Sequence, residues 1–174
     1  MRKTLFRSIL RAPLTEAAPP ADEAALAELA ASVDAAALRR LGRSLAIREV
    51  DAGSCNGCEL EIHAINNAFY DLERFGIRFV ASPRHADVLL VTGPVTWNMR
   101  EGLERTYAAT PAPKWVVAVG DCGFDGGIFA GSYAVVGGAS AVVPVDLHIR
   151  GCPPTPTQLL RGLLALLNAA GQDR

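Results

Sequence analysis

The sequence predicts an α/β fold in which helices cover both faces of a doubly wound, mainly parallel sheet. From residue 44 onward, segments with the pattern of strands alternate with segments of helical spacing, which is typical of βαβ units. Two predicted strands, residues 88–92 and 115–119, are apolar without alternation, which indicates burial on both faces. A chain of 174 residues with 50% hydrophobic side chains suits one such domain with a terminal extension.

The first 43 residues are predicted to be a helical N-terminal extension, and the α/β domain is expected over residues 44–174. Helical spacing is found at residues 1–12, where prolines then end it, and again at residues 23–32 and 35–41. Alanine and leucine dominate the extension. We therefore expect it to pack on another surface, either of this domain or of another subunit.

The hydrophobic pattern of the domain gives the expected order of its elements. Strands are expected at residues 44–50, 79–81, 88–92 and 114–120, and helices at residues 58–75, 98–109 and 154–170. The last helix is rich in leucine and follows a double proline, a residue type that is favoured in the first turn of a helix.

The charge and hydropathy of the chain argue against several classes of function. With 17 basic and 18 acidic side chains, the net charge is −1, so we expect no nucleic-acid partner. No uninterrupted apolar run reaches the roughly 20 residues that span a bilayer, so no transmembrane segment is expected. The basic, amphipathic N-terminus lacks the apolar stretch and cleavage site of a secretory signal, which points to the cytoplasm.

The four cysteines lie at junctions between predicted elements. Cys55 and Cys58 follow the first strand of the domain, Cys122 follows the strand at residues 115–119, and Cys152 precedes the last helix. Loops at the carboxyl ends of parallel strands share one edge of the sheet, where ligands bind in open α/β folds. Because a cytoplasmic chain rarely forms disulfides, metal binding or catalysis is the leading interpretation.

The surroundings of the cysteines favour an iron–sulfur cluster over the other thiol sites. Glycines flank each of them, and glycine lets the backbone bend tightly and approach a bulky group, where its N–H groups can donate to sulfur. A zinc site with four cysteines is the nearest alternative, although structural zinc usually takes two closely spaced pairs. A thioredoxin-like C-x-x-C pair would leave Cys122 and Cys152 without a role. The glycine-rich loop at residues 120–127 lacks the Lys-Ser/Thr of a P-loop.

Three stretches around the cysteines resemble a known family. They are residues 53–59 (GSCNGCE), 119–129 (VGDCGFDGGIF) and 144–156 (PVDLHIRGCPPTP). They are similar, in the same order, to the small subunits of nickel–iron hydrogenases and to the homologous 20-kDa subunit of respiratory complex I. The similarity covers about residues 44–168. It implies a flavodoxin-like domain with one 4Fe–4S cluster, whose ligands would be Cys55, Cys58, Cys122 and Cys152.

The spacing of the first two cysteines distinguishes the branches of this family. In the complex I branch the two ligands are adjacent, whereas Asn56 and Gly57 separate them here, as in the hydrogenase branch. The chain also lacks the second cysteine-rich segment of small subunits that bind three clusters. The resemblance is therefore to the small subunit of membrane-bound, complex-I-like (group 4) nickel–iron hydrogenases.

That resemblance implies an electron-transfer subunit of an oxidoreductase, with no complete active site and no catalytic residue of its own. Its cluster would relay electrons between ferredoxin-like polyferredoxin subunits and the nickel–iron site of a separate large subunit. Membrane subunits of the same complex would hold it at the cytoplasmic face of the inner membrane, as a peripheral protein. The alternatives are a quinone-reducing subunit of a complex I-type NADH:quinone oxidoreductase and a zinc-stabilised scaffold without redox function.

Other side chains near the motifs have weaker assignments. Glu59 either interacts with the dipole of the helix after Cys58 or faces the large subunit or a proton path. Asp51 and Asp121 are expected to organise loops through hydrogen bonds. His148 is the histidine best placed to couple a proton to electron transfer, and Arg150 could raise the cluster potential. An apolar run, expected in the core of a free-standing protein and at an interface in a subunit, comprises Phe124, Ile128, Phe129 and Tyr133.

Overall fold

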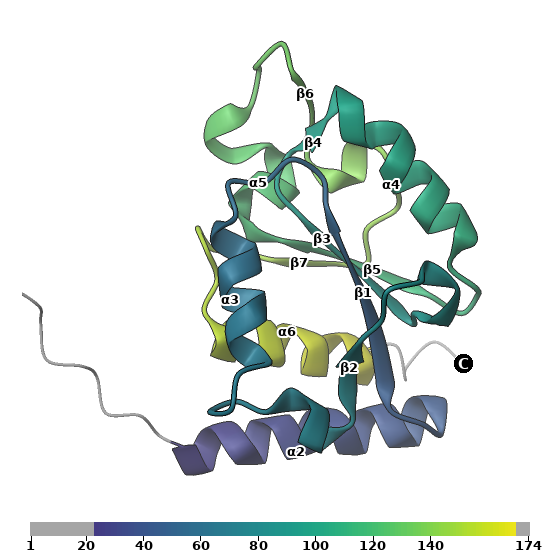
Figure 1. Ribbon diagram of the computed structural model, residues 1–174, viewed down its shortest axis with the longest axis vertical. Helices are drawn as coiled ribbons and strands as arrows, with labels where there is room; N and C mark the ends of the chain where they lie inside the picture. Colours follow the sequence, from purple (N-terminus) through teal and green to yellow (C-terminus); the bar gives the residue numbers. More distant parts are fainter. Residues whose placement is uncertain (1–22, 170–174) are drawn as a thin grey trace, which may run out of the picture.

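A five-stranded parallel sheet forms the centre of the domain in the computed structural model, which describes residues 23–169 (Figure 1). The sheet order is β2-β1-β3-β5-β7, and every neighbouring pair is parallel. This order corresponds to the flavodoxin-like 2-1-3-4-5 arrangement. The predicted fold class is therefore confirmed. The strands of the sheet are β1 (Leu45–Asp51), β2 (Ile77–Phe79), β3 (Val88–Thr92), β5 (Trp115–Val119) and β7 (Leu147–Ile149).

Helices and short turns connect the strands and cover the sheet. The α-helices are α2 (Glu23–Leu41), α3 (Gly57–Ile65), α4 (Trp97–Ala109), α5 (Gly120–Asp125) and α6 (Pro156–Ala169). The 3₁₀ turns are η1 (Leu72–Phe75), η2 (Pro83–His85), η3 (Gly127–Phe129) and η4 (Ala139–Ala141). A separate antiparallel pair joins β4 (Val95–Thr96) to β6 (Val135–Gly137) beyond the carboxyl edge of the main sheet (Figure 1).

Two hydrophobic clusters, one on each face, explain the continuous apolar strands. In β3, Val88 and Leu90 pack with α2, α3 and α6, whereas Leu89 and Val91 pack with α4 on the other face. β5 alternates in the same way. Since both faces are covered, a strand at the centre of the sheet gains from apolar side chains in both directions.

The described part of the N-terminal extension is one helix that packs on the domain. Residues 23–32 and 35–41, predicted as two helices, form the continuous helix α2, because no glycine or proline interrupts residues 23–41. Val33 and Ala37 of α2 are fully buried in the same cluster as the leucines of α6. The helix predicted at residues 1–12 lies outside the described residues.

The helix predicted over residues 58–75 is shorter than expected. α3 ends at Ile65, and the side chain of Asn67 then accepts hydrogen bonds from the N–H groups of Phe69 and Tyr70. Asparagine favours such local turns over helix, which explains the early end. Among the residues that the structure describes, no helix is both long and apolar enough to cross a membrane.

Candidate metal centre

The sheet topology brings the four cysteines to one edge. Cys55 lies between β1 and α3, and Cys58 lies in the first turn of α3. Cys122 lies in α5, which directly follows β5, and Cys152 lies in the loop after β7. These loops all leave the carboxyl edge of the sheet (Figure 1). The thiols of Cys55, Cys122 and Cys152 are all near enough to Cys58 to act on its ionisation. The predicted convergence of distant cysteines is therefore present in the fold.

Close contacts connect the three cysteine loops. The sulfur of Cys58 lies 4.0 Å from the carbonyl oxygen of Val119, at the end of β5. A Cβ added to Gly57 would lie 3.5 Å from the sulfur of Cys55 and 4.0 Å from a ring carbon of Pro153. The N–H of Asp121 donates to the carbonyl of Gly151 over 2.9 Å, which joins the Cys122 loop to the Cys152 loop.

The thiols differ in burial, and burial controls their ionisation. Cys55 and Cys152 are exposed, whereas Cys58 and Cys122 are partly buried. Burial, followed by the charges of Glu59 and the other three cysteines, raises the pKa of Cys58 to about 12. Burial also raises the pKa of Cys122, against the effect of a hydrogen bond from the backbone of Ile128. A metal that binds here must therefore displace protons from thiols that are neutral at physiological pH.

Two glycines leave space beside the partly buried sulfurs. A Cβ at Gly120 would lie 2.7 Å from the sulfur of Cys58, and a Cβ at Gly127 would lie 2.8 Å from the sulfur of Cys122. Both glycines have positive φ, +82° and +53°, which other residues rarely adopt. Because both positions are glycine, no side chain occupies the space next to the sulfurs of Cys58 and Cys122.

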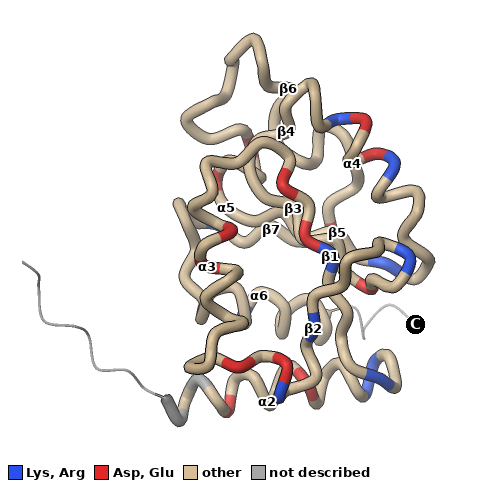
Figure 2. The backbone as a smooth tube through the Cα atoms, in the orientation of Figure 1, with Lys and Arg blue, Asp and Glu red and all other residues tan. Residues whose placement is uncertain are grey.

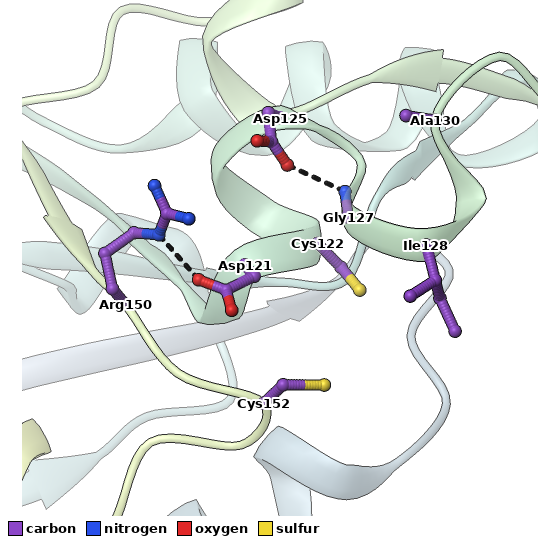
Figure 3. Close-up of a pocket in the computed structure, with 8 residues that line it drawn as sticks. All are labelled: Asp121, Cys122, Asp125, Gly127, Ile128, Ala130, Arg150 and Cys152. Carbon is purple, nitrogen blue, oxygen red and sulfur yellow. Dashed lines mark hydrogen bonds and ion pairs between the residues drawn. The ribbon is translucent and has the colours of Figure 1, made fainter.

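A pocket of about 510 Å³ opens between the Cys122 and Cys152 loops. Figure 3 shows the sulfur atoms of Cys122 and Cys152 on the same side of the pocket, with Ile128 at its rim. The residues that line it are Asp121, Cys122, Asp125, Gly127, Ile128, Ala130, Arg150 and Cys152. Two of the four cysteines, from separate strand ends, therefore face one pocket.

The arrangement does not match a preformed zinc site. A zinc ion bound by four cysteines needs every sulfur at about 2.3 Å from one centre. Within residues 23–169, no three His, Cys, Asp or Glu side chains are placed to hold one metal ion. In a 4Fe–4S cluster each cysteine can bind a different iron atom, so the four sulfurs need not meet at one centre.

Two aspartates organise the loops, as the sequence predicted. Asp51 accepts hydrogen bonds from the N–H groups of Gly53 and Ser54, each over 2.8 Å, and so shapes the turn before Cys55. Asp121 accepts hydrogen bonds from the N–H of Gly151 and from the guanidinium of Arg150. Neither aspartate is placed as a ligand.

Two carboxylates are removed from solvent: Glu59, directly after Cys58, is buried, and Glu49 of β1 is partly buried. Glu59 is only 7% exposed, and neither carboxylate oxygen has a hydrogen-bond partner within the described part of the chain. Glu49 lies on the face of β1 that Ile47 also occupies, and acidic positions gather at the carboxyl end of this strand (Figure 2). Burial raises the pKa of Glu49, and Glu59 adds to the effect. The alternation of inward positions along β1 is the signal that could have revealed Glu49.

Several aromatic and apolar side chains of the segment after Cys122 lie at the surface. His148 of β7 packs edge-on against Phe124, with ring centroids 4.8 Å apart, and its Nδ1 has no partner among the described residues. Ile128 and Tyr133 are 85% and 97% exposed. The run predicted as either core or interface is thus exposed, which favours the interface interpretation.

Comparison with known proteins identifies the family. Residues 55–166 match the family model of the NADH ubiquinone oxidoreductase 20-kDa subunit, which is more than half of the chain. The chain belongs to this family. The matched segment contains all four cysteines.

Members of the family include subunits of hydrogenases and of quinone oxidoreductases. The chain is 48% identical over 145 residues to formate hydrogenlyase subunit 7 of Escherichia coli, covering 83% of this chain but only 57% of that protein. It is 46% identical over 127 residues to a probable membrane-bound hydrogenase subunit of Pyrococcus furiosus, covering 73% and 76% of the two chains. It is also 46% identical over 110 residues to an NADH-quinone oxidoreductase subunit of Heliobacterium modesticaldum, covering 63% of each chain.

A solved structure shares the fold of this family member. A chain of the membrane-bound sulfane sulfur reductase, an archaeal respiratory membrane complex, superimposes with a TM-score of 0.68 and 34% sequence identity. The match covers 82% of this chain and 77% of the other. The flavodoxin-like order of strands is thus found in a relative that is part of a membrane complex.

Proposed function

We propose that Cys55, Cys58, Cys122 and Cys152 hold one 4Fe–4S cluster, and that the chain is an electron-transfer subunit of a membrane-associated, complex-I-like nickel–iron hydrogenase. The observation that carries the proposal is the convergence of these thiols, from three separate strand ends, at one edge of the sheet. Loop glycines leave room beside two of the sulfurs. Four thiolates in such surroundings are the ligand set of a 4Fe–4S cluster.

In this proposal, the residues of the chain bind and orient the 4Fe–4S cluster and restrict its contact with water. When bound, the cluster supplies one-electron transfer at a potential set by its charge, hydrogen bonds and exposure. Cys58 and Cys122 provide the inner ligands, and the exposed thiols of Cys55 and Cys152 provide the outer ones. The backbone N–H of Ile128 donates to the thiol of Cys122.

The exposed side chains beside the pocket suit the large subunit that we propose as partner. Ile128 lines the pocket and is almost fully exposed, with Tyr133 in the same segment. Apolar and aromatic residues are enriched at the centre of subunit interfaces, where they exclude water. A partner that covers this segment would bring its nickel–iron site to the cluster. Ferredoxin-like subunits would exchange electrons with the same cluster.

The hydrogenase assignment depends on the C-x-x-C spacing more than on overall identity. The identities to the two hydrogenase subunits and to the quinone oxidoreductase subunit are similar, at 46–48%. Asn56 and Gly57 separate the first two cysteines, which is the spacing of the hydrogenase branch. A quinone-reducing role is the second candidate, supported by the match to the NADH-quinone oxidoreductase of Heliobacterium modesticaldum.

The partner decides between these two functions. The chain, carrying an affinity tag, is purified anaerobically from its own organism with the proteins bound to it. We expect a large subunit that has two C-x-x-C pairs and contains nickel, together with H₂-dependent reduction of a dye. We also expect the complex to be recovered from the membrane fraction, with this chain on the cytoplasmic side. A large subunit without these cysteines, in a complex that reduces quinone, would refute the hydrogenase assignment.

A further inference from the structure

One ion pair connects two of the cysteine loops at the edge of the pocket. Asp121, directly before Cys122, pairs with Arg150, which lies two positions before Cys152. Asp121 also makes two hydrogen bonds with Gly151. Its N–H donates to the carbonyl of Gly151, and its carboxylate accepts a hydrogen bond from the N–H of Gly151. These contacts hold the β5–α5 junction against the loop after β7.

Arg150 is fixed in place by more than its pairing with Asp121. Its guanidinium lies over the ring of Phe124, 4.1 Å from the ring centroid, and Phe124 in turn packs against His148. A cation over an aromatic face is attracted by the ring even at a partly exposed site. The side chain of Arg150 therefore lies against α5, where it contacts both Asp121 and Phe124.

The negative charge of Asp121 lies beside the Cys122 and Cys152 thiols, and the positive charge of Arg150 is paired with it. In Figure 3 the carboxylate of Asp121 lies between the guanidinium of Arg150 and the side chain of Cys152. Asp121 directly precedes Cys122 in the chain, and its carboxylate lines the same pocket as Cys122 and Cys152. Each electron added to a cluster adds a negative charge, and an uncompensated carboxylate nearby would oppose that addition.

We infer that the Asp121–Arg150 pair positions the Cys122 and Cys152 loops and balances charge, with Arg150 keeping the reduction potential above the value that Asp121 alone would give. The aspartate supplies the acceptor that holds the two loops together, and the arginine cancels its charge. This inference rests on the proposed cluster. In addition to the cluster ligands, Asp121 and Arg150 thus have roles at the site.

The test is an EPR-monitored redox titration of the full chain with its cluster assembled anaerobically. In Arg150→Gln, we expect reduction to become about tenfold less favourable, which for one electron corresponds to a potential lower by about 59 mV. Arg150→Lys keeps the charge and should stay near the parent value. The matched control is Arg105→Gln, which removes a charge from an ion pair on α4, where Arg105 is 79% exposed. It should leave the potential unchanged.

Variants of Asp121 separate the electrostatic role from the positioning role. Asp121→Asn keeps an acceptor and removes the charge, so the potential should rise. The double variant Asp121→Asn/Arg150→Gln should return towards the parent potential, which a purely structural role of Arg150 would not produce. Asp121→Ala removes the acceptor, so a chelator should extract iron faster than from the parent or from Asp121→Asn.

Each outcome bears on the inference. If Arg150→Gln has the parent potential and an unchanged spectrum, or if Asp121→Asn lowers the potential, the inference is wrong although the cluster is present. If Arg150→Gln fails to assemble a cluster, the upward shift in Asp121→Asn still decides the electrostatic part. A parent chain that assembles no cluster overturns the proposed function, and this inference with it.

Discussion

The sulfur of Cys58 and the backbone of Gly120 are in such close contact that any side chain at position 120 would collide with the sulfur. A Cβ there would lie 2.7 Å from the sulfur of Cys58, and Gly120 has a φ of +82°. The two residues come from different strand ends, β1 and β5. The fold therefore depends on a glycine at the point where two cysteine loops approach each other.

Gly120→Ala should reduce cluster binding because the new methyl group displaces the Cys58 sulfur. The matched control is Gly131→Ala, since Gly131 has a similar φ of +79° and no described atom lies within 4 Å of its added Cβ. Both changes should cost about 1–2 kcal/mol through the left-handed backbone. Only Gly120→Ala should also lower the iron content per chain. Equal iron content in the two variants would show that the close contact is irrelevant to binding.

Cys152→Ser should lose or convert the cluster and abolish electron transfer, because a serine oxygen is a poorer ligand than a thiolate. Cys152 is exposed, so the fold should survive the change, as judged by far-UV circular dichroism. Iron should fall below the about four atoms per chain of an intact 4Fe–4S site. Thr155→Ser, a conservative change in the same loop, serves as the control. Full activity and unchanged iron in Cys152→Ser would remove it from the ligand set.

Glu49→Gln should stabilise the chain at neutral pH, because burial raises the pKa of Glu49 above its ordinary value of 4.5. The folded state then binds the proton more tightly than the unfolded state, so stability falls as the pH rises from 4.5 through the folded-state pKa. Glutamine does not titrate and avoids this loss. The urea midpoint should be higher in Glu49→Gln at about pH 7, and the difference should shrink at about pH 4.

The control for this measurement is Glu101→Gln, which changes an exposed carboxylate on α4. Its urea midpoint should follow that of the parent chain at both pH values. If the difference in urea midpoint between Glu49→Gln and the parent is as large at acidic pH as at neutral pH, burial of the Glu49 charge is not the cause of the stabilisation.

Ile128→Asp should weaken association with the proposed large subunit without destabilising the chain. Ile128 is 85% exposed and lines the pocket, so an aspartate is tolerated in the free chain but costly in an interface. We expect a dissociation constant at least about tenfold higher, with an unchanged melting temperature. Leu38→Asp, at a residue of α2 that is 48% exposed, is the control. Equal affinity for both variants would place the interface elsewhere.

The fold can be predicted where the hydrophobic signal is long. The predicted ranges of β3, β5, α4 and α6 agree with the structure within two residues, because each has at least five residues with a clear pattern. β4, β6 and β7 are not predicted because they have only two or three residues. β7 completes the sheet only by pairing with β5, a long-range interaction that no local pattern encodes.

The place of the four cysteines in the fold can be predicted from the sequence, but the packing of the side chains around them cannot. Placing the cysteines at strand ends is enough to expect their convergence, because parallel strands share one carboxyl edge. Burial of Glu59 could not be foreseen, since it depends on how the first turn of α3 packs. The stacking of Arg150 on Phe124 likewise joins the loop after β7 to helix α5, which is distant in sequence.

The most direct test of the central claim is a low-temperature EPR spectrum of the anaerobically purified, dithionite-reduced full chain, with metal analysis of the same sample. We expect the signal of one reduced 4Fe–4S cluster and about four iron atoms per chain, with little zinc. One zinc ion per chain and no paramagnetic signal would contradict it. The four cysteines would then stabilise a scaffold and carry no electrons.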